Sequence, residues 1–243
     1  MILWSAERKH CVMIGAGAVG LLFFLLFLAS STPCLGDPDP GKERLEAVLT
    51  GIKGNYAALP GLTVPYERDV VTRSMAILDE NIKSDVASGL IHFKPPHFLR
   101  IEQRTPRTEL VISDGQVLWW YIPEKKEAYR YSTRKMGKEL KLLSDVFQGL
   151  KEVEDGFQVE LTDPGECGPY HLKLIPQPPW TDIDFILLDI SREDYTIQSF
   201  KIHNYLGGFT RFTLGDPTIR KGFEKGFFAF VPPEGVRIIK EED

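Results

Sequence analysis

Apolar and polar residues alternate along most of the chain beyond residue 60. It is clearest in the strand predicted near His97–Gln103, where Leu99 and Ile101 alternate with Arg100 and Glu102. Two more short apolar runs, Glu109–Ser113 and Gln116–Ile122, flank an Asp-Gly turn and predict two further strands. Period-two alternation predicts strands with one apolar and one polar face. The same pattern predicts further strands at Leu62–Ser74, Asn81–Lys94, Glu127–Ser132, Phe157–Leu161, Tyr170–Ile175, Phe185–Ile190, Ile197–Asn204, Gly208–Leu214 and Phe227–Phe230.

Two segments have a helical period instead, Gly41–Tyr56 and Lys138–Leu150. Their apolar residues recur at spacings of three and four, which is typical of a helix with one buried side. Many strands in up-and-down order with only two helices exclude a doubly wound α/β fold. The pattern therefore predicts a mainly β fold, with one strongly curved antiparallel sheet and both helices over its apolar face.

Two helices cannot fill the interior of a barrel of this circumference, so we expect a hydrophobic cavity beneath a helical lid. The lid residues are expected to be Leu45, Leu49, Leu143 and Phe147. The histidines that alternate with apolar neighbours, His92 among them, are expected on the opposite, solvated face. The residues predicted to line the sheet side of the cavity are Ile91, Phe93, Leu99, Ile101, Trp119, Tyr121, Phe200 and Ile202.

The N-terminus predicts export. Arg8, Lys9 and His10 precede a long apolar run that ends in small residues before the acidic Asp37. This order is typical of a secretory signal peptide, predicted over residues 1–36, with a single domain over residues 37–243. Cleavage near Ala29–Ser31, an uncleaved membrane anchor and lipidation of Cys34 remain alternatives. Removal of the signal leaves Cys167 as the one cysteine, so no intrachain disulfide is expected.

The sequence offers little that indicates catalysis. The formal net charge is −5 without a basic stripe, which argues against a nucleic-acid partner. Gly15–Gly20 matches a dinucleotide fingerprint, but it continues into the apolar run of the signal rather than into a strand–helix unit. The acidic residues between Asp182 and Asp194 lack the ligand spacing of a calcium loop. We therefore expect a protein that is not an enzyme, with no metal and no cofactor.

Two segments resemble the outer-membrane lipoprotein carrier proteins of Gram-negative bacteria. One is Gly89-x-Ile-x-Phe-Lys-x-Pro-x-Phe98 followed by Val111-x-Ser-Asp-Gly-x-x-Leu-Trp-x-Tyr-x-Pro123, and the other is Phe228-x-Phe-x-Pro-Pro-x-Gly-Val236. The resemblance implies an unclosed β-barrel with a helical lid, located in the periplasm. It implies a shuttle that takes acylated lipoproteins from an inner-membrane lipoprotein-releasing ABC transporter and passes them to an outer-membrane lipoprotein acceptor.

The chain departs from this family at the corner after the second predicted strand. Family members commonly have an arginine there that holds the lid closed, whereas this chain has Pro95, which has no donor. Lys94 or Arg100 is the candidate replacement for that latch. The alternative functions are an envelope-stress sensor or regulatory domain, a lipid-anchored acceptor, and a carrier of another lipid, all using the same half-barrel.

Overall fold

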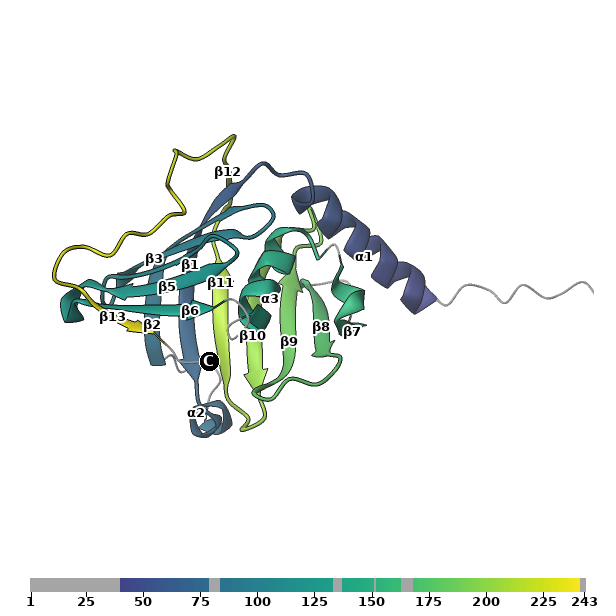
Figure 1. Ribbon diagram of the computed structural model, residues 1–243. Coiled ribbons are helices and arrows are strands. Elements are labelled where there is room, and N and C mark those ends of the chain that lie inside the picture. Colours follow the sequence, from purple (N-terminus) through teal and green to yellow (C-terminus); the bar gives the residue numbers. More distant parts are fainter. Residues whose placement is uncertain (1–39, 79–83, 133–136, 151, 163–167, 241–243) are drawn as a thin grey trace, which may run out of the picture. The chain divides into compact units, whose positions relative to one another are not determined.

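The computed structural model describes residues 40–78, 84–132, 137–150, 152–162 and 168–240 (Figure 1). They lie in one compact unit, Pro38–Asp243. The predicted signal peptide and its alternatives, including Cys34, lie outside the described residues, as does Cys167. Within the described ranges, every helix is too short or too polar to cross a membrane.

The strands form a single open sheet, which confirms the mainly β, unclosed architecture. Its order is β13-β6-β5-β4-β3-β2-β1-β11-β10-β9-β8-β7, with β12 paired to β1. The two outer strands of this order, β13 and β7, do not pair with each other in the described chain. The bounds are β1 Leu62–Val71, β2 Ser84–Lys94, β3 Phe98–Thr105, β4 Glu109–Ser113, β5 Val117–Ile122, β6 Glu127–Ser132, β7 Phe157–Thr162, β8 Tyr170–Pro176, β9 Ile183–Ile190, β10 Ile197–Asn204, β11 Phe209–Leu214, β12 Thr218–Ile219 and β13 Arg237–Lys240.

Both predicted helices are confirmed, as α1 Pro40–Tyr56 and α3 Gly137–Phe147. The prediction missed α2, Arg73–Leu78, because six residues are too few to reveal a helical period. The described residues also contain two short 3₁₀ turns, η1 Pro123–Lys125 and η2 Val153–Asp155.

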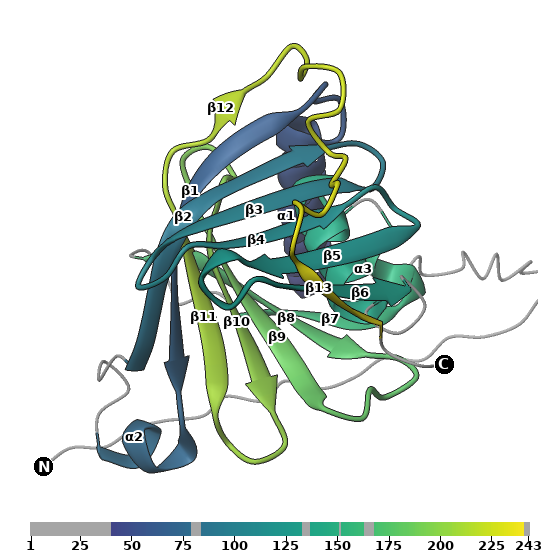
Figure 2. The ribbon, with the colours of Figure 1, turned by 60° about the vertical axis from the view of Figure 1, so that its left-hand side comes forward.

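The strand predicted at 227–230 is wrong. Phe227 and Phe228 lie in a turn and the next two residues are irregular, and the terminal strand is β13, which pairs with β6 in parallel. The aromatic alternation in this segment reflects packing against the sheet rather than pairing within it. Figure 2 shows the C-terminal segment crossing the strands on the side away from α1.

The register assigns every side chain of the central strands to one of two faces, because directly paired residues point the same way. One row runs from Leu62 through Phe93, Leu99 and Ser113 to Leu118. We call its side the concave face, since Leu62, Phe93 and Leu99 belong to the hydrophobic core shared with α1 and α3. The neighbouring row, which includes His92 and Trp119, lies on the opposite, convex face.

Candidate functional site

The candidate site is the apolar interior between the concave face and the two long helices. On the sheet side, Ile91, Phe93, Leu99 and Phe200 are each no more than 1% exposed. Their helix counterparts are equally buried, and the ring centroids of Phe93 and Phe147 lie 5.8 Å apart. The helix residues that occupy this interior, each at most 2% exposed, are Val48 and Ile52 of α1, Leu142 and Val146 of α3, and Phe147. In the described structure, helix side chains therefore occupy the space in which we expected a cavity.

The remaining lid and lining candidates divide between the two faces. Leu45, Leu49 and Leu143 are partly buried against the core, and Ile101 and Ile202 pack against it in the same way. Trp119 and Tyr121 do not, because the register places both on the convex face. Their rings lie 5.5 Å and 5.3 Å from that of Phe230 in the C-terminal segment. Assigning these two side chains to the lining was wrong.

The aromatic residue of β5 that faces inward is Trp120. It pairs with Val111, which pairs with Ile101 and through it with Ile91, so all four share the concave face. Trp120 is half-buried and stacks on Tyr129 at 5.2 Å between centroids. Sequence reasoning missed it because consecutive tryptophans occupy both faces, and only the register with Ile101 distinguishes them.

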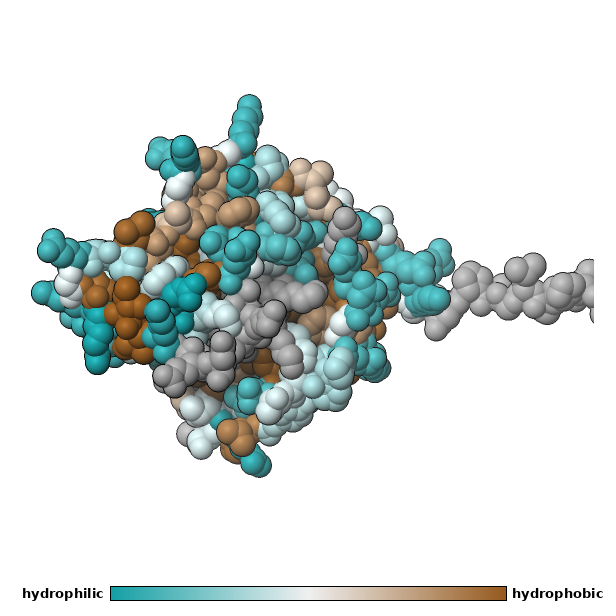
Figure 3. Space-filling view, viewed as in Figure 1, coloured by the Kyte–Doolittle hydropathy of each residue, from teal (hydrophilic) through white to brown (hydrophobic). Residues whose placement is uncertain are grey.

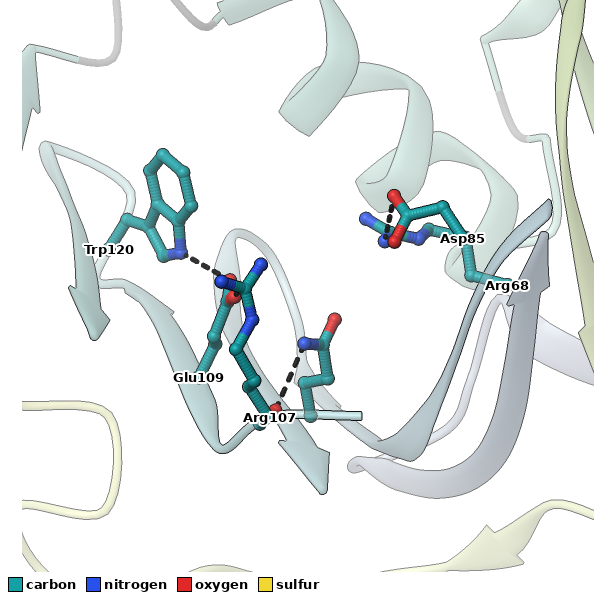
Figure 4. Close-up of polar contacts among 6 residues, drawn as sticks. Arg68, Asp85, Arg107, Glu109 and Trp120 are labelled. Atoms are coloured by element: carbon teal, nitrogen blue, oxygen red, sulfur yellow. Dashed lines mark hydrogen bonds and ion pairs between the residues drawn. The ribbon is translucent and has the colours of Figure 1, made fainter. Parts of the chain in front are cut away.

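A polar rim borders this apolar region (Figure 4). The indole N–H of Trp120 donates to Glu109 Oε2 at 2.9 Å, and Arg107 lies 3.9 Å from the same carboxylate group. Arg68 and Asp85 form a second ion pair at 3.3 Å. Each of these charged groups faces a partner. The described residues contain no cluster of three or more side chains suited to hold a metal ion.

Helix α1 is held to the β9–β10 turn by close packing and by hydrogen bonds. A Cβ on Gly51 would lie 2.4 Å from the ring of Tyr195, so this mid-helix glycine permits the ring to contact the helix backbone. Asn55 donates to the carbonyl of Asp194, and the Ile197 N–H donates to the Tyr56 hydroxyl at 3.0 Å. Burial of that hydroxyl raises the pKa of Tyr56.

Helix α3 is held through residues at its C-terminal end. Gly149 has φ +76°, and a Cβ there would approach the Ile52 carbonyl of α1 to 3.0 Å, so only glycine fits this crossing without strain. The Gln148 amide donates to the carbonyl of Pro96 at 3.1 Å. The corner between β2 and β3 is thus connected to α3, with the donor on the helix side.

Neither candidate latch residue faces the helices. Lys94 pairs with Phe98 on the convex face, and its ammonium lies 5.5 Å from the Phe98 ring. Arg100 is also convex: it donates to Glu102 at 2.7 Å and to the Phe227 carbonyl at 3.0 Å. The latch assignment of these cations was wrong, since alternate residues of a strand point to opposite faces.

The convex face is covered by aromatic side chains of the C-terminal segment. His92 is 8% exposed beneath Phe223 and Phe227, whose centroids lie 6.2 Å and 5.0 Å from its ring. Thr63 Oγ1 lies 2.9 Å from His92 Nδ1, while Nε2 is buried without a hydrogen-bond partner. Burial lowers the pKa of His92. The expectation that this histidine is solvated was wrong, because a sequence-distant segment covers its strand.

A family model, several proteins of known function and several solved structures are similar to this chain. The model of the outer membrane lipoprotein carrier protein LolA family matches residues 78–231, more than half of the chain. The outer-membrane lipoprotein carrier protein of Hahella chejuensis is 23% identical over 196 residues, covering 80% of this chain and 89% of the relative. That of Psychromonas ingrahamii is 23% identical over 220 residues, covering 87% and 91%. The solved structure of a LolA superfamily protein from Nitrosomonas europaea is 10% identical and covers 76% of this chain and 97% of that one, with a TM-score of 0.44.

Proposed function

The chain belongs to the outer-membrane lipoprotein carrier protein family, and from that premise we propose that it is a periplasmic shuttle for acylated lipoproteins. In this proposal the acyl chains bind on the concave face, beneath α1 and α3. The cargo comes from an inner-membrane lipoprotein-releasing ABC transporter and goes to an outer-membrane acceptor. The protein performs no chemistry on its cargo.

The observation that carries the proposal is the contiguous apolar interior shared by an open sheet and two helices. Its core includes residues from both helices and from most of the concave strands. Transfer of an acyl chain of about fifteen methylenes out of water contributes roughly 12 kcal/mol, at about 0.8 kcal/mol for each methylene. That gain is large enough to hold cargo. It is too large for ready release unless another apolar group competes with the acyl chain for the interior.

The helices supply that competition. Phe147 and Val146 occupy the apolar interior themselves, so cargo must displace them and expose part of the core to enter. Reburial of the same side chains when the cargo leaves offsets part of the acyl-transfer gain. A lid that fills its own binding site therefore makes binding reversible.

The neighbouring tryptophans of β5 offer a direct test. A brominated fatty acid quenches tryptophan emission at short range, and Trp120 faces inward while Trp119 faces Phe230. Because Trp180 also packs against the core, both variants carry W180F. We expect quenching of W119F/W180F, which retains the inward tryptophan, and much weaker quenching of W120F/W180F. A triacylated lipopeptide should reverse the quenching. Equal quenching of both variants, or none in either, would contradict acyl binding on the concave face.

A second measurement separates a free shuttle from the tethered alternatives. The mass of the mature protein reports whether its N-terminus follows a cleaved signal peptide, as a shuttle requires. An acylated Cys34 or an intact N-terminal segment would instead favour a lipid-anchored acceptor or a membrane-bound sensor.

A further inference from the structure

One end of the sheet carries apolar side chains that project into solvent. The β1–β2 connection contains α2, in which Ile77 is 74% exposed. The β10–β11 connection contains Tyr205 and Leu206, which are 54% and 80% exposed. Figures 1 and 2 both show α2 and this connection at the same end of the molecule, and the space-filling view shows hydrophobic surface at that end (Figure 3).

The two connections are neighbours in the fold. Val71, the last residue of β1, pairs with Phe209, the first residue of β11, so both connections leave the same end of adjacent strands. A Cβ placed on Gly207 would lie 3.3 Å from side-chain carbons of Arg73, so the aliphatic part of that arginine contacts the β10–β11 turn. We call the described residues 72–78 and 205–208 the apolar tip.

The apolar tip itself contains one charged residue, Arg73, and in the sequence the β1–β2 connection continues beyond it with Asp79, Glu80 and Lys83. Transfer of leucine and isoleucine side chains from water into hydrocarbon is favourable, and tyrosine favours the membrane–water interface. An arginine beside them can keep its guanidinium at the headgroup phosphates. Projecting side chains on two narrow turns suit shallow insertion better than a flat protein interface, which buries about 800 Å² on each partner.

We propose that the apolar tip inserts transiently into the surface of a phospholipid bilayer. This inference rests on the proposed function, since a shuttle of acylated cargo collects and delivers it at membranes. The chain as a whole is acidic, with a formal net charge of −5, so the contact depends on apolar insertion rather than on general attraction to anionic lipid. A contact made by three side chains is weak, which suits a carrier that must leave again.

Flotation of the mature protein with phosphatidylethanolamine–phosphatidylglycerol vesicles tests the proposal. We expect co-flotation that persists at high salt, and a loss of partitioning of roughly tenfold for each of L206D and I77D. The matched control is V231D, since Val231 is 83% exposed on the C-terminal segment, away from the apolar tip. It should float like the wild type.

Failure of the inference is distinguishable from failure of the proposed function. Wild-type protein that does not float, or L206D and I77D variants that float like V231D, would overturn the insertion. Binding to native inner-membrane vesicles but not to pure lipid would overturn it as well, in favour of a protein partner. Brominated fatty acid quenching in the L206D variant reports acyl binding separately, and retained quenching there leaves the carrier proposal standing.

Discussion

Truncation of Phe147 tests whether the helices compete with cargo for the interior. The side chain is 2% exposed, and its ring lies 5.8 Å from that of Phe93. Truncation of a buried phenylalanine to alanine costs about 3–5 kcal/mol in stability. In the proposed mechanism this ring leaves the interior before an acyl chain enters, so part of that loss falls on closure of the lid. If about 2 kcal/mol of the loss destabilises the closed lid, F147A should bind an acyl probe roughly 30-fold more tightly than the wild type.

Two measurements are needed. Urea unfolding gives the free energy of unfolding, and titration of the folded protein with a fluorescent fatty acid in the absence of urea gives its acyl affinity. The matched control is F228A, because Phe228 is 8% exposed and packs on Phe98 at the convex face. We expect F228A to lose stability without a gain in acyl affinity. If F147A loses stability while its probe affinity stays equal or falls, the reasoning that helix side chains act as a competing filler is refuted.

Three further predictions concern the helix contacts and the covered convex face. G51A should lower the free energy of unfolding by about 1–2 kcal/mol in urea, because overpacking against Tyr195 exceeds the gain in helix propensity. Q148A should weaken hydrogen-exchange protection of the α3 amides, because it removes a contact of about 1 kcal/mol that joins the helix to the β2–β3 corner. As the pH is lowered, the free energy of unfolding should decrease less steeply in H92N than in the wild type. The pKa of His92 is lowered in the fold, so its stabilising contribution is complete above the unfolded-state pKa and decreases as pH falls toward the folded-state pKa.

Each of these has an internal control. Gly54 lies in the same helix with open space at its Cβ position, so G54A should raise stability by about 1 kcal/mol; if G51A does the same, the Tyr195 contact is not tight. Unaltered exchange in α3 of the Q148A variant would show that the Pro96 contact does not hold the helix. Parallel pH profiles of H92N and the wild type would show that other groups carry the acid dependence.

The spacing of apolar residues was sufficient to predict most helices and strands and most of the residues that line the interior. Period-two alternation predicted the strands from β1 to β11, and helical spacing predicted α1 and α3 to within a few residues. It also placed Ile91, Phe93 and Leu99 together, because polar His92 separates Ile91 from Phe93 and polar Arg100 follows Leu99. Where both neighbours are apolar, as at Trp119 and Trp120, alternation gives no direction, and the prediction chose the outward residue.

Covering segments are the second kind of feature that pattern could not supply. His92 alternates with apolar residues as a solvated side chain would, yet Phe227 from a segment more than 130 residues away lies on it. The contact between Gln148 and Pro96 is equally non-local. The alternation along a strand indicates which face each residue occupies. It carries no information about which other segment packs on that face.

Local spacing thus determined the elements, the two-faced sheet and the family resemblance, because each depends on neighbours along one strand or helix. The tertiary structure decided which aromatic rings face the interior, what holds the helices over it and which turns meet at the apolar tip. Those features depend on strand register and on contacts between distant segments, which form only when the sheet curves and the chain returns across it.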